Sequence, residues 1–254
     1  MIAKAVLFDF ADTLVCTERF DYDKCLDKTV QSLSMNGLIV PFERFKQGYF
    51  NSRDRFYKQT EKTLEEQNFA ERITETLESC GIKLSAGDQR TREATEAFSN
   101  CFANSLTMNS YLPSLLEKLH KKYKLAIVSN MSFADALFKS LAEFNISNHF
   151  DAIVVSGNLG WRKPSPRIFK KALQTLRVKA EEAIFVGDSL RADIKGAEQL
   201  GIKTILLNEK NKKQPVTDTA QLYIKEDRNS VKSDKTIRKL ANLPRALRNL
   251  SKQS

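Results

Sequence analysis

Four sets of polar side chains follow short apolar runs of this sequence, and their residue types can act on an anionic phosphoryl group. The sets are Asp9 with Thr13, Ser129 with Asn130, Lys163, and Asp188 with Asp193. A carboxylate can attack phosphorus or bind a hard cation, a lysine supplies a point charge, and a serine hydroxyl donates a hydrogen bond. Because open parallel sheets bind ligands outside the carboxyl ends of their strands, we expect the four sets to form one site.

The elements that would position these side chains alternate between strand and helix patterns. Short apolar or β-branched runs predict strands at 4–8, 125–128, 152–155, 183–186 and 204–207. Helical spacing of apolar residues predicts helices at 112–122, 133–144, 166–176 and 191–200. This alternation is typical of parallel βαβ units, so we predict an α/β fold with a Rossmann-like parallel sheet.

A long insertion interrupts this alternation. More than 100 residues separate the first predicted strand from the second, which is too many for a simple crossover. Within the gap, amphipathic patterns predict helices at 21–34, 42–57, 63–80 and 88–103. The sequence therefore predicts an α/β core formed by 1–16 and 106–225, an inserted all-helical cap at 17–105, and a basic, helical C-terminal tail at 226–254.

Composition limits the location and the partners of the chain. Its 254 residues are enough to bury a sizeable core. The opening apolar run is too short for a secretory signal, and no stretch approaches the roughly 18 apolar residues of a membrane span. Four cysteines without a C-x-x-C pair and only two histidines argue against a zinc site. We expect a cytoplasmic protein with reduced thiols and no membrane partner.

The positive charge of the chain is concentrated near its end. The net charge is +10, and residues 208–254 hold 12 Lys and Arg against 5 Asp and Glu. This segment has a single aromatic residue, Tyr223, and no nucleic-acid-binding motif, so a solvated helix explains it better than a nucleic-acid partner.

The four sets resemble, in the same order, the motifs of the haloacid dehalogenase (HAD) superfamily. Those motifs are an Asp nucleophile in DxD[GT]T, a Ser or Thr, a Lys, and a GDxxxxD acid pair. Here they read DFADT from Asp9, Ser129, Lys163 within RKPSP, and GDSLRAD from Gly187 to Asp193. The resemblance covers the whole chain, inserted cap included, and RKPSP looks more like the phosphatase branch.

The resemblance implies a Mg²⁺-dependent hydrolase that dephosphorylates a small phosphorylated metabolite through an aspartyl-phosphate on Asp9. The implied metal ligands are Asp9, the main-chain carbonyl of Ala11, Asp188 and Asp193. The implied substrate contacts are Thr13, Ser129, Asn130 and Lys163, of which Ser129 and Lys163 would stabilise the phosphoryl group. We expect a monomer or a homodimer.

The sequence departs from the phosphatase pattern at Ala11, where the family has a second Asp that protonates the leaving oxygen. General acid–base catalysis is typically worth about 10² to 10⁴ in rate. Its loss would impair the hydrolysis of alkyl phosphates far more than that of acyl, aryl or anhydride substrates. Asp12 could replace the missing acid if the chain turned helically after Asp9, because residues three apart then share a face.

Ala11 is also consistent with two functions that differ from phosphomonoester hydrolysis. Phosphonoacetaldehyde hydrolases of this superfamily also carry Ala at this position and use a cap lysine that forms a Schiff base, for which Lys46 and Lys58 lie in the right region. Alternatively, the chain is a catalytically impaired HAD protein that now acts as a binding or regulatory module.

Overall fold

A six-stranded parallel sheet forms the centre of the computed structural model, which describes residues 3–208 and 231–252. The strand order is β5-β4-β1-β6-β7-β8, and every neighbouring pair is parallel. The strands are β1 (Ala5–Phe8), β4 (Lys124–Ser129), β5 (Ala152–Val155), β6 (Ala183–Gly187), β7 (Lys203–Leu207) and β8 (Lys235–Ile237). The chain adds β4 and β5 on one side of β1 and β6 to β8 on the other, which opens a crevice at the carboxyl ends near β1. The predicted α/β fold is confirmed.

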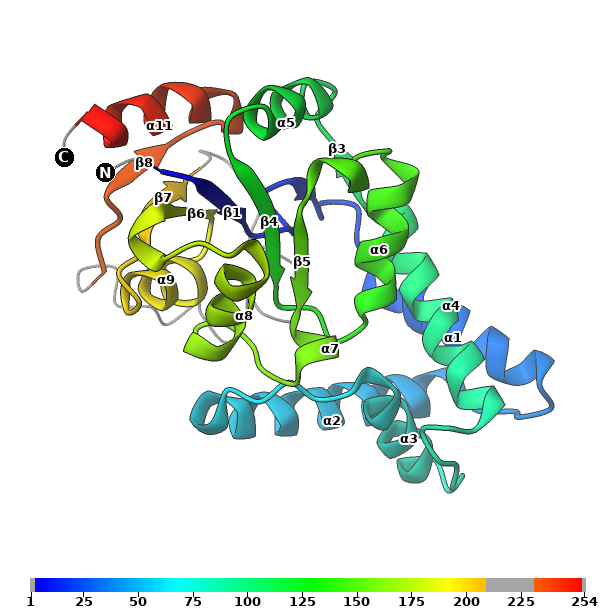
Figure 1. The fold of residues 1–254 in the computed structure, drawn as a ribbon. Helices are drawn as coiled ribbons and strands as arrows, with labels where there is room; N and C mark the ends of the chain where they lie inside the picture. The colour runs from blue at the N-terminus through cyan, green and yellow to red at the C-terminus, as the bar shows by residue number, and fades with distance from the viewer. Residues whose placement is uncertain (1–2, 209–230, 253–254) are drawn as a thin grey trace.

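Helices cover both faces of the sheet because its strands are apolar on both sides (Figure 1). Leu7 faces a buried cluster that includes α8 (Pro166–Leu176) and α9 (Gly196–Glu198). Phe8 faces the opposite cluster, which includes α5 (Leu112–His120), α6 (Ala134–Glu143) and α11 (Leu243–Lys252). Shorter helical segments complete the core: η1 (Ser147–His149), α7 (Ser156–Leu159), η2 (Ala180–Glu182), the π-helix η3 (Leu190–Lys195) and η4 (Leu240–Asn242).

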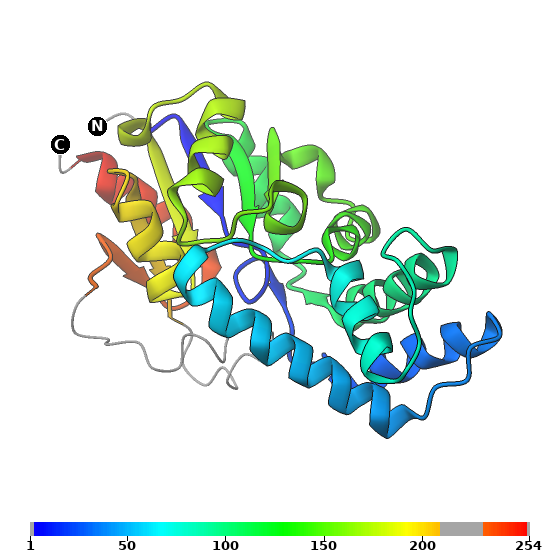
Figure 2. The ribbon, with the colours of Figure 1, turned by 90° about the horizontal axis from the view of Figure 1, so that it is seen from below.

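The inserted segment forms four helices, which we call the cap. They are α1 (Tyr22–Met35), α2 (Phe42–Thr63), α3 (Phe69–Ser79) and α4 (Gln89–Ser105). The cap joins the core through a short antiparallel pair that the sequence did not predict, β2 (Val15–Cys16) with β3 (Thr107–Met108). Figure 2 shows α2 running from the far end of the cap back to the core.

The start of the third cap helix is a correction. The sequence predicts a helix at 63–80, but α2 continues to Thr63 and α3 begins only at Phe69. Leu64 adopts the left-handed conformation (φ 57°), which ends α2, and the side chain of Asn68 accepts a hydrogen bond from Ala70 N and so caps α3. Residues between the two helices are therefore a loop that returns to the core.

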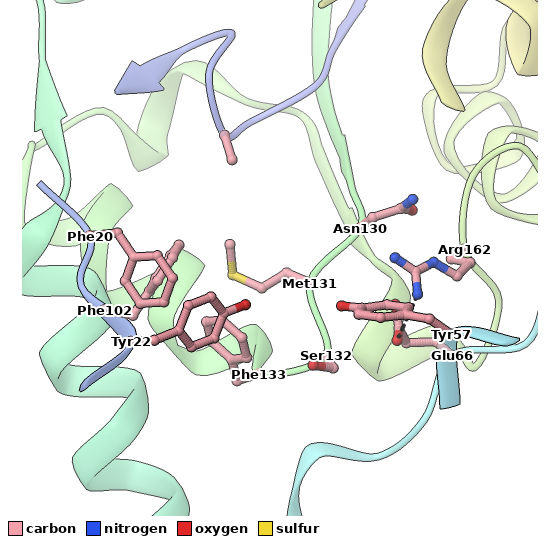
Figure 3. A pocket seen from close by; sticks show the side chains of 11 residues that line it. Phe20, Tyr22, Tyr57, Glu66, Phe102, Asn130, Met131, Ser132, Phe133 and Arg162 are labelled. Carbon is pink, nitrogen blue, oxygen red and sulfur yellow. Dashed lines mark ion pairs between the residues drawn. The ribbon is translucent and has the colours of Figure 1, made fainter. Parts of the chain in front are cut away.

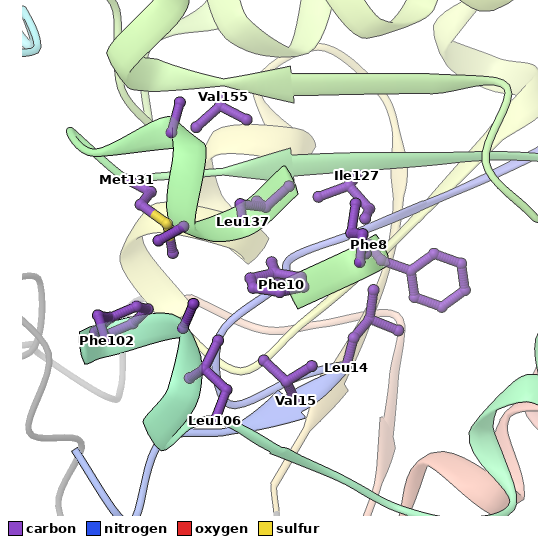
Figure 4. Close-up of a cluster of buried hydrophobic side chains, with 14 of the residues drawn as sticks. Phe8, Phe10, Leu14, Val15, Phe102, Leu106, Ile127, Met131, Leu137 and Val155 are labelled. Carbon is purple, nitrogen blue, oxygen red and sulfur yellow. The ribbon is translucent and has the colours of Figure 1, made fainter. Parts of the chain in front are cut away.

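One apolar cluster joins the cap to the core (Figure 4). Phe10 and Leu14 come from the loop after β1, whereas Phe102 and Leu106 come from the end of α4, and all four are buried. Burying a large apolar side chain stabilises a fold by about 1.5–3 kcal/mol. The end of α4 is therefore firmly anchored to the core.

The C-terminal segment belongs to the sheet. The sequence suggests a helical basic tail at 226–254, and the proposed boundary near 225 lies outside the described residues. The described part supplies β8, which pairs with β7, and α11, whose Leu243 and Leu247 are buried. The apolar face of this helix is what brings the basic segment back onto the core. Across 3–208 and 231–252, no helix is both long enough and apolar enough to cross a membrane.

Candidate active site

Lys163 connects two acids that lie far from it in the sequence. Its Nζ is 2.6 Å from Asp9 Oδ1 and 2.7 Å from Asp193 Oδ1, and its side chain is only 1% exposed. Asp9 directly follows β1, and its main-chain N donates a hydrogen bond to Val186 O of β6 (2.9 Å). Adjacent strand ends thus bring together three of the charges that the motifs predicted.

The end of β4 holds the backbone of Lys163 in place. Asn130 Oδ1 accepts a hydrogen bond from Lys163 N (2.7 Å), and Asn130 Nδ2 donates one to Lys163 O (3.0 Å). Ser129, the last residue of β4, is buried beside it. The amide group of Asn130 thus positions the lysine, and the substrate contact expected of Asn130 stays a prediction.

Asp188 directly follows β6, and Asp193 lies in the first turn of η3, which begins two residues later. Ser189 N donates a hydrogen bond to Asp193 Oδ2 (3.0 Å), and Thr13 Oγ1 donates one to Asp188 Oδ1 (3.5 Å). A Cβ at Gly187 would lie 2.3 Å from Asp193 Oδ2, so only glycine lets the carboxylate lie against the strand. The expected helix at 191–200 begins as a π-helix, a rare form that is frequent at functional sites.

Burial and mutual attraction set the charge states of this cluster. Burial raises the pKa of Asp193 to about 6, although Lys163 opposes the shift. Burial alone would lower the pKa of Lys163, but Asp193 and Asp9 together raise it above its usual value. The lysine is therefore a permanent cation between two carboxylates.

The acids fit a magnesium ion. Asp9, Asp188 and Asp193 each offer an oxygen within 4.8 Å of the other two. Carboxylate oxygens are the ligands that Mg²⁺ prefers, and one lysine cannot neutralise three ionised carboxylates. A divalent cation would therefore relieve an excess of buried negative charge at this position.

The loop after β1 directs the side chains of Asp12 and Ala11 to different places. Asp12 adopts a left-handed conformation (φ 61°), which Gly and Asp tolerate better than most residues. Its carboxylate accepts hydrogen bonds from Thr17 Oγ1 (2.9 Å) and Thr17 N (3.2 Å). The structure therefore directs this side chain to the start of the cap connection.

Ala11 instead lines a small, partly open chamber between the core and the cap (Figure 3). The chamber has a volume of about 40 Å³, which leaves room for only a few water molecules. The core contributes Ala11, Asn130, Met131, Ser132, Phe133 and Arg162, and the cap contributes Phe20, Tyr22, Tyr57, Glu66 and Phe102. Figure 3 shows mostly aromatic side chains at one end and Arg162, Tyr57, Glu66 and Asn130 at the other.

At the polar end of this chamber, the sequence indicated Asn130 but did not indicate Arg162, Tyr57 or Glu66. Burial raises the pKa of Tyr57 to about 12, so its hydroxyl stays protonated. Arg162 and Glu66 form an ion pair (3.7 Å) in which each side chain is 2% exposed. The position of Arg162 beside Lys163 could have drawn attention to it, but nothing in the local sequence marks Glu66.

Comparison with known proteins agrees with this geometry. A family model described as haloacid dehalogenase-like hydrolase matches residues 6–207, which is most of the chain. The chain belongs to the haloacid dehalogenase-like hydrolases. Membership in this HAD family confirms the resemblance that the four motifs suggested.

Relatives of this HAD protein carry phosphatase names. A glyceraldehyde 3-phosphate phosphatase from Methanopyrus kandleri is 27% identical over 208 residues, which are 80% of this chain and 82% of the relative. A phosphoserine phosphatase from Thermus thermophilus is 32% identical over 141 residues, covering 54% of this chain and 53% of the relative. These names support the phosphatase branch of the HAD family.

Solved structures share the HAD fold over nearly the whole chain. A 2-haloacid dehalogenase from Pseudomonas syringae has a TM-score of 0.68 at 23% identity, covering 98% of this chain and all of its own. At this identity, the likeness concerns the fold, including the helical insertion.

Proposed function

We propose that this chain is a Mg²⁺-dependent phosphatase that forms an aspartyl-phosphate on Asp9 and hydrolyses a small phosphorylated metabolite. The observation that supports this most directly is Lys163 Nζ, held between Asp9 and Asp193 at 2.6 and 2.7 Å beside Asp188. The relatives named above act, by their names, on small phosphorylated compounds, which supports a substrate of this class.

Each residue of the cluster has a role in this proposal. The Asp9 carboxylate attacks phosphorus, and the bond from phosphorus to the leaving oxygen breaks; water then attacks phosphorus and releases Asp9. Lys163 and Ser129 stabilise the oxygens of the phosphoryl group, while Asn130 holds Lys163 in place. The proposed magnesium ligands are Asp9, Asp188, Asp193 and the main-chain carbonyl of Ala11. When bound, Mg²⁺ supplies positive charge to the phosphoryl group.

The leaving group should depart with little help from an acid. Ala11 presents a methyl group to the chamber where the family has a proton donor. Asp12 is poorly placed to replace it because Thr17 binds its carboxylate. We therefore expect acyl, aryl or anhydride phosphates to be better substrates than alkyl phosphates.

The phosphonoacetaldehyde-hydrolase alternative receives less support. Lys46 is 2.6 Å from Asp23, and Lys58 lines a separate hollow on α2 with Asn51 and Arg55. Of the described residues that line the chamber, none is a lysine. A Schiff-base mechanism would need one there.

Phosphate release from aryl, acyl and alkyl phosphates tests the proposal, with and without EDTA. Activity should need Mg²⁺, and Asp9→Asn should lower it by roughly 10⁴-fold or more. Ala11→Asp should raise alkyl phosphate hydrolysis by about 10² to 10⁴-fold and change aryl phosphate hydrolysis much less. A chain that releases no phosphate from any of them, yet binds inorganic phosphate, would be a binding module instead. Trapping by borohydride would indicate Schiff-base chemistry.

A further inference from the structure

A short stretch of β-type pairing closes the cap onto the core at one point. The cap loop (residues 64–66) follows α2, and the core loop (residues 160–162) leads directly into Lys163. Glu65 and Trp161 form an antiparallel bridge between them. The flanking hydrogen bonds run from Glu66 N to Gly160 O and from Arg162 N to Leu64 O, each 3.0 Å long.

The side chain of Glu66 adds buried contacts to this pairing. Its Oε2 accepts a hydrogen bond from Ser156 Oγ (2.7 Å), and Oε1 is 3.7 Å from Arg162 Nη1. Ser156 Oγ in turn accepts a hydrogen bond from Met131 N (2.8 Å). One cap carboxylate therefore binds Ser156, which follows β5, and is linked through Ser156 to Met131, which follows β4.

This contact cannot stay closed throughout a reaction cycle. The chamber of about 40 Å³ is too small for a phosphorylated metabolite, so the cap must move away from the core to admit one. Water solvates the Glu66 carboxylate when the cap opens, and Ser156 and Arg162 replace that water when the cap closes. A closed cap that left the carboxylate without these partners would bury an unpaired charge, which is costly. Glu66 is therefore suited to favour the closed arrangement in which the cap loop and the core loop are aligned.

We propose that Glu66 is a positioning residue that closes the cap and aligns the loop carrying Lys163. The pairing of residues 64–66 with 160–162 forms after substrate enters and breaks before product leaves. Its link to turnover rests on the proposed phosphatase function, whereas the opening of the pairing can be measured without turnover.

The kinetic test compares Glu66→Ala and Glu66→Gln with a matched control, Glu61→Gln, which removes the same charge from an exposed position on α2. We expect kcat for an aryl phosphate to fall by about 10²-fold in Glu66→Ala, because a misplaced reacting group costs roughly that much. Glu66→Gln should recover part of the rate, since an amide oxygen can still accept from Ser156. Glu61→Gln should keep the natural kcat and KM.

A second readout needs no catalysis, because Trp161 is the single tryptophan of the chain. It lies in the core loop, where its ring packs against the Arg167 guanidinium at 3.6 Å. Acrylamide should quench its fluorescence more strongly in Glu66→Ala than in the natural protein or Glu61→Gln. Added Mg²⁺ and inorganic phosphate should reduce quenching in the natural protein.

A reversible crosslink keeps the proposal testable if Glu66→Ala does not fold. Glu65 and Trp161 are a non-hydrogen-bonded antiparallel pair, whose Cα atoms lie close together. In a Glu65→Cys, Trp161→Cys double variant, a disulfide oxidant such as oxidised glutathione would take two electrons from the two thiols, which lose two protons and form a disulfide. Turnover should stop on oxidation and return on reduction, and the single variants should respond to neither.

The outcomes separate the two proposals. If the natural protein releases no phosphate, the phosphatase proposal fails, and tryptophan quenching still tests the pairing. The role of Glu66 is overturned if Glu66→Ala keeps the natural kcat and quenching. It is also overturned if the disulfide-crosslinked protein turns over as fast as the same variant with its thiols reduced.

Discussion

Two neighbouring cations, Lys163 and Arg162, show how differently the core and the cap contact use buried charge. Lys163 lies 2.6 and 2.7 Å from Asp9 and Asp193, and all three belong to segments that follow strands of one sheet. Arg162 reaches across to Glu66 of the cap at 3.7 Å. Both cations are almost fully buried, but Lys163 lies within hydrogen-bonding distance of two acids, whereas the distance from Arg162 Nη1 to Glu66 Oε1 is 3.7 Å.

The difference reflects what each pair has to do. The core cluster must hold reacting groups in fixed positions, and the parallel sheet provides rigid attachment points for them. The contact with the cap must form and break, so a looser ion pair supported by Ser156 suits it better. Buried charge therefore provides fixed geometry in one region and reversible closure in the other.

The largest expected effect, and the sharpest way to break this comparison, is Lys163→Met. It leaves Asp9 and Asp193 buried without their cation, so the free energy of unfolding should fall by about 3–5 kcal/mol in EDTA. Phosphate release should fall by about 10² to 10³-fold. Urea unfolding and a phosphate assay measure both effects. Lys170→Met on the exposed face of α8 is the control. If Lys163→Met lost no more stability and activity than Lys170→Met, a rigid charge cluster would be contradicted.

An intermediate effect is expected from Gly187→Ala. The added methyl group would lie 2.3 Å from Asp193 Oδ2 and must displace the carboxylate. Mg²⁺ affinity, followed by calorimetry with the metal alone, should fall by about 10 to 100-fold. Gly87→Ala is the control, because the nearest atom to its Cβ is Ser85 Oγ at 3.9 Å. Unchanged Mg²⁺ affinity would show that Asp193 need not occupy this position.

The smallest effect should come from Arg55→Gln in the cap. The Arg55–Glu75 pair is short (2.7 Å), but its side chains are 61% and 39% exposed. Exposed ion pairs contribute about 0–1 kcal/mol, so thermal unfolding should change little, and less still at high salt. A loss comparable with that of Lys163→Met would mean that distance, and not burial, decides the strength of these pairs.

The sequence predicts much of the core because its strands are short apolar runs that end on polar residues. Ala152–Val155 and Pro166–Leu176 lie where the pattern places them. The pair β2–β3 and strand β8 were missed, since two or three residues carry too little periodicity to be recognised. These elements depend on partners far away in the chain.

The site residues also divide into those that a local motif predicts and those that depend on distant partners. Asp9, Lys163, Asp188 and Asp193 are predictable because each follows an apolar run within a recognisable motif, and the structure brings them together. The contact of Asn130 with the Lys163 backbone could not be predicted, because it spans 33 positions of the chain. The sequence does not indicate Glu66, because this residue reaches the core only through the loop that begins where Leu64 ends α2.

Strand β8 makes the family match an unsafe guide to where the chain can be cut. The matched segment ends at residue 207, the last residue of β7, whereas the sheet continues through Lys235–Ile237. A shortened protein ending there would present the unpaired N–H and C=O groups of β7 and uncover the apolar surface beneath α11. Such a fragment should self-associate through its open sheet edge, so a shortened protein should keep β8 and α11.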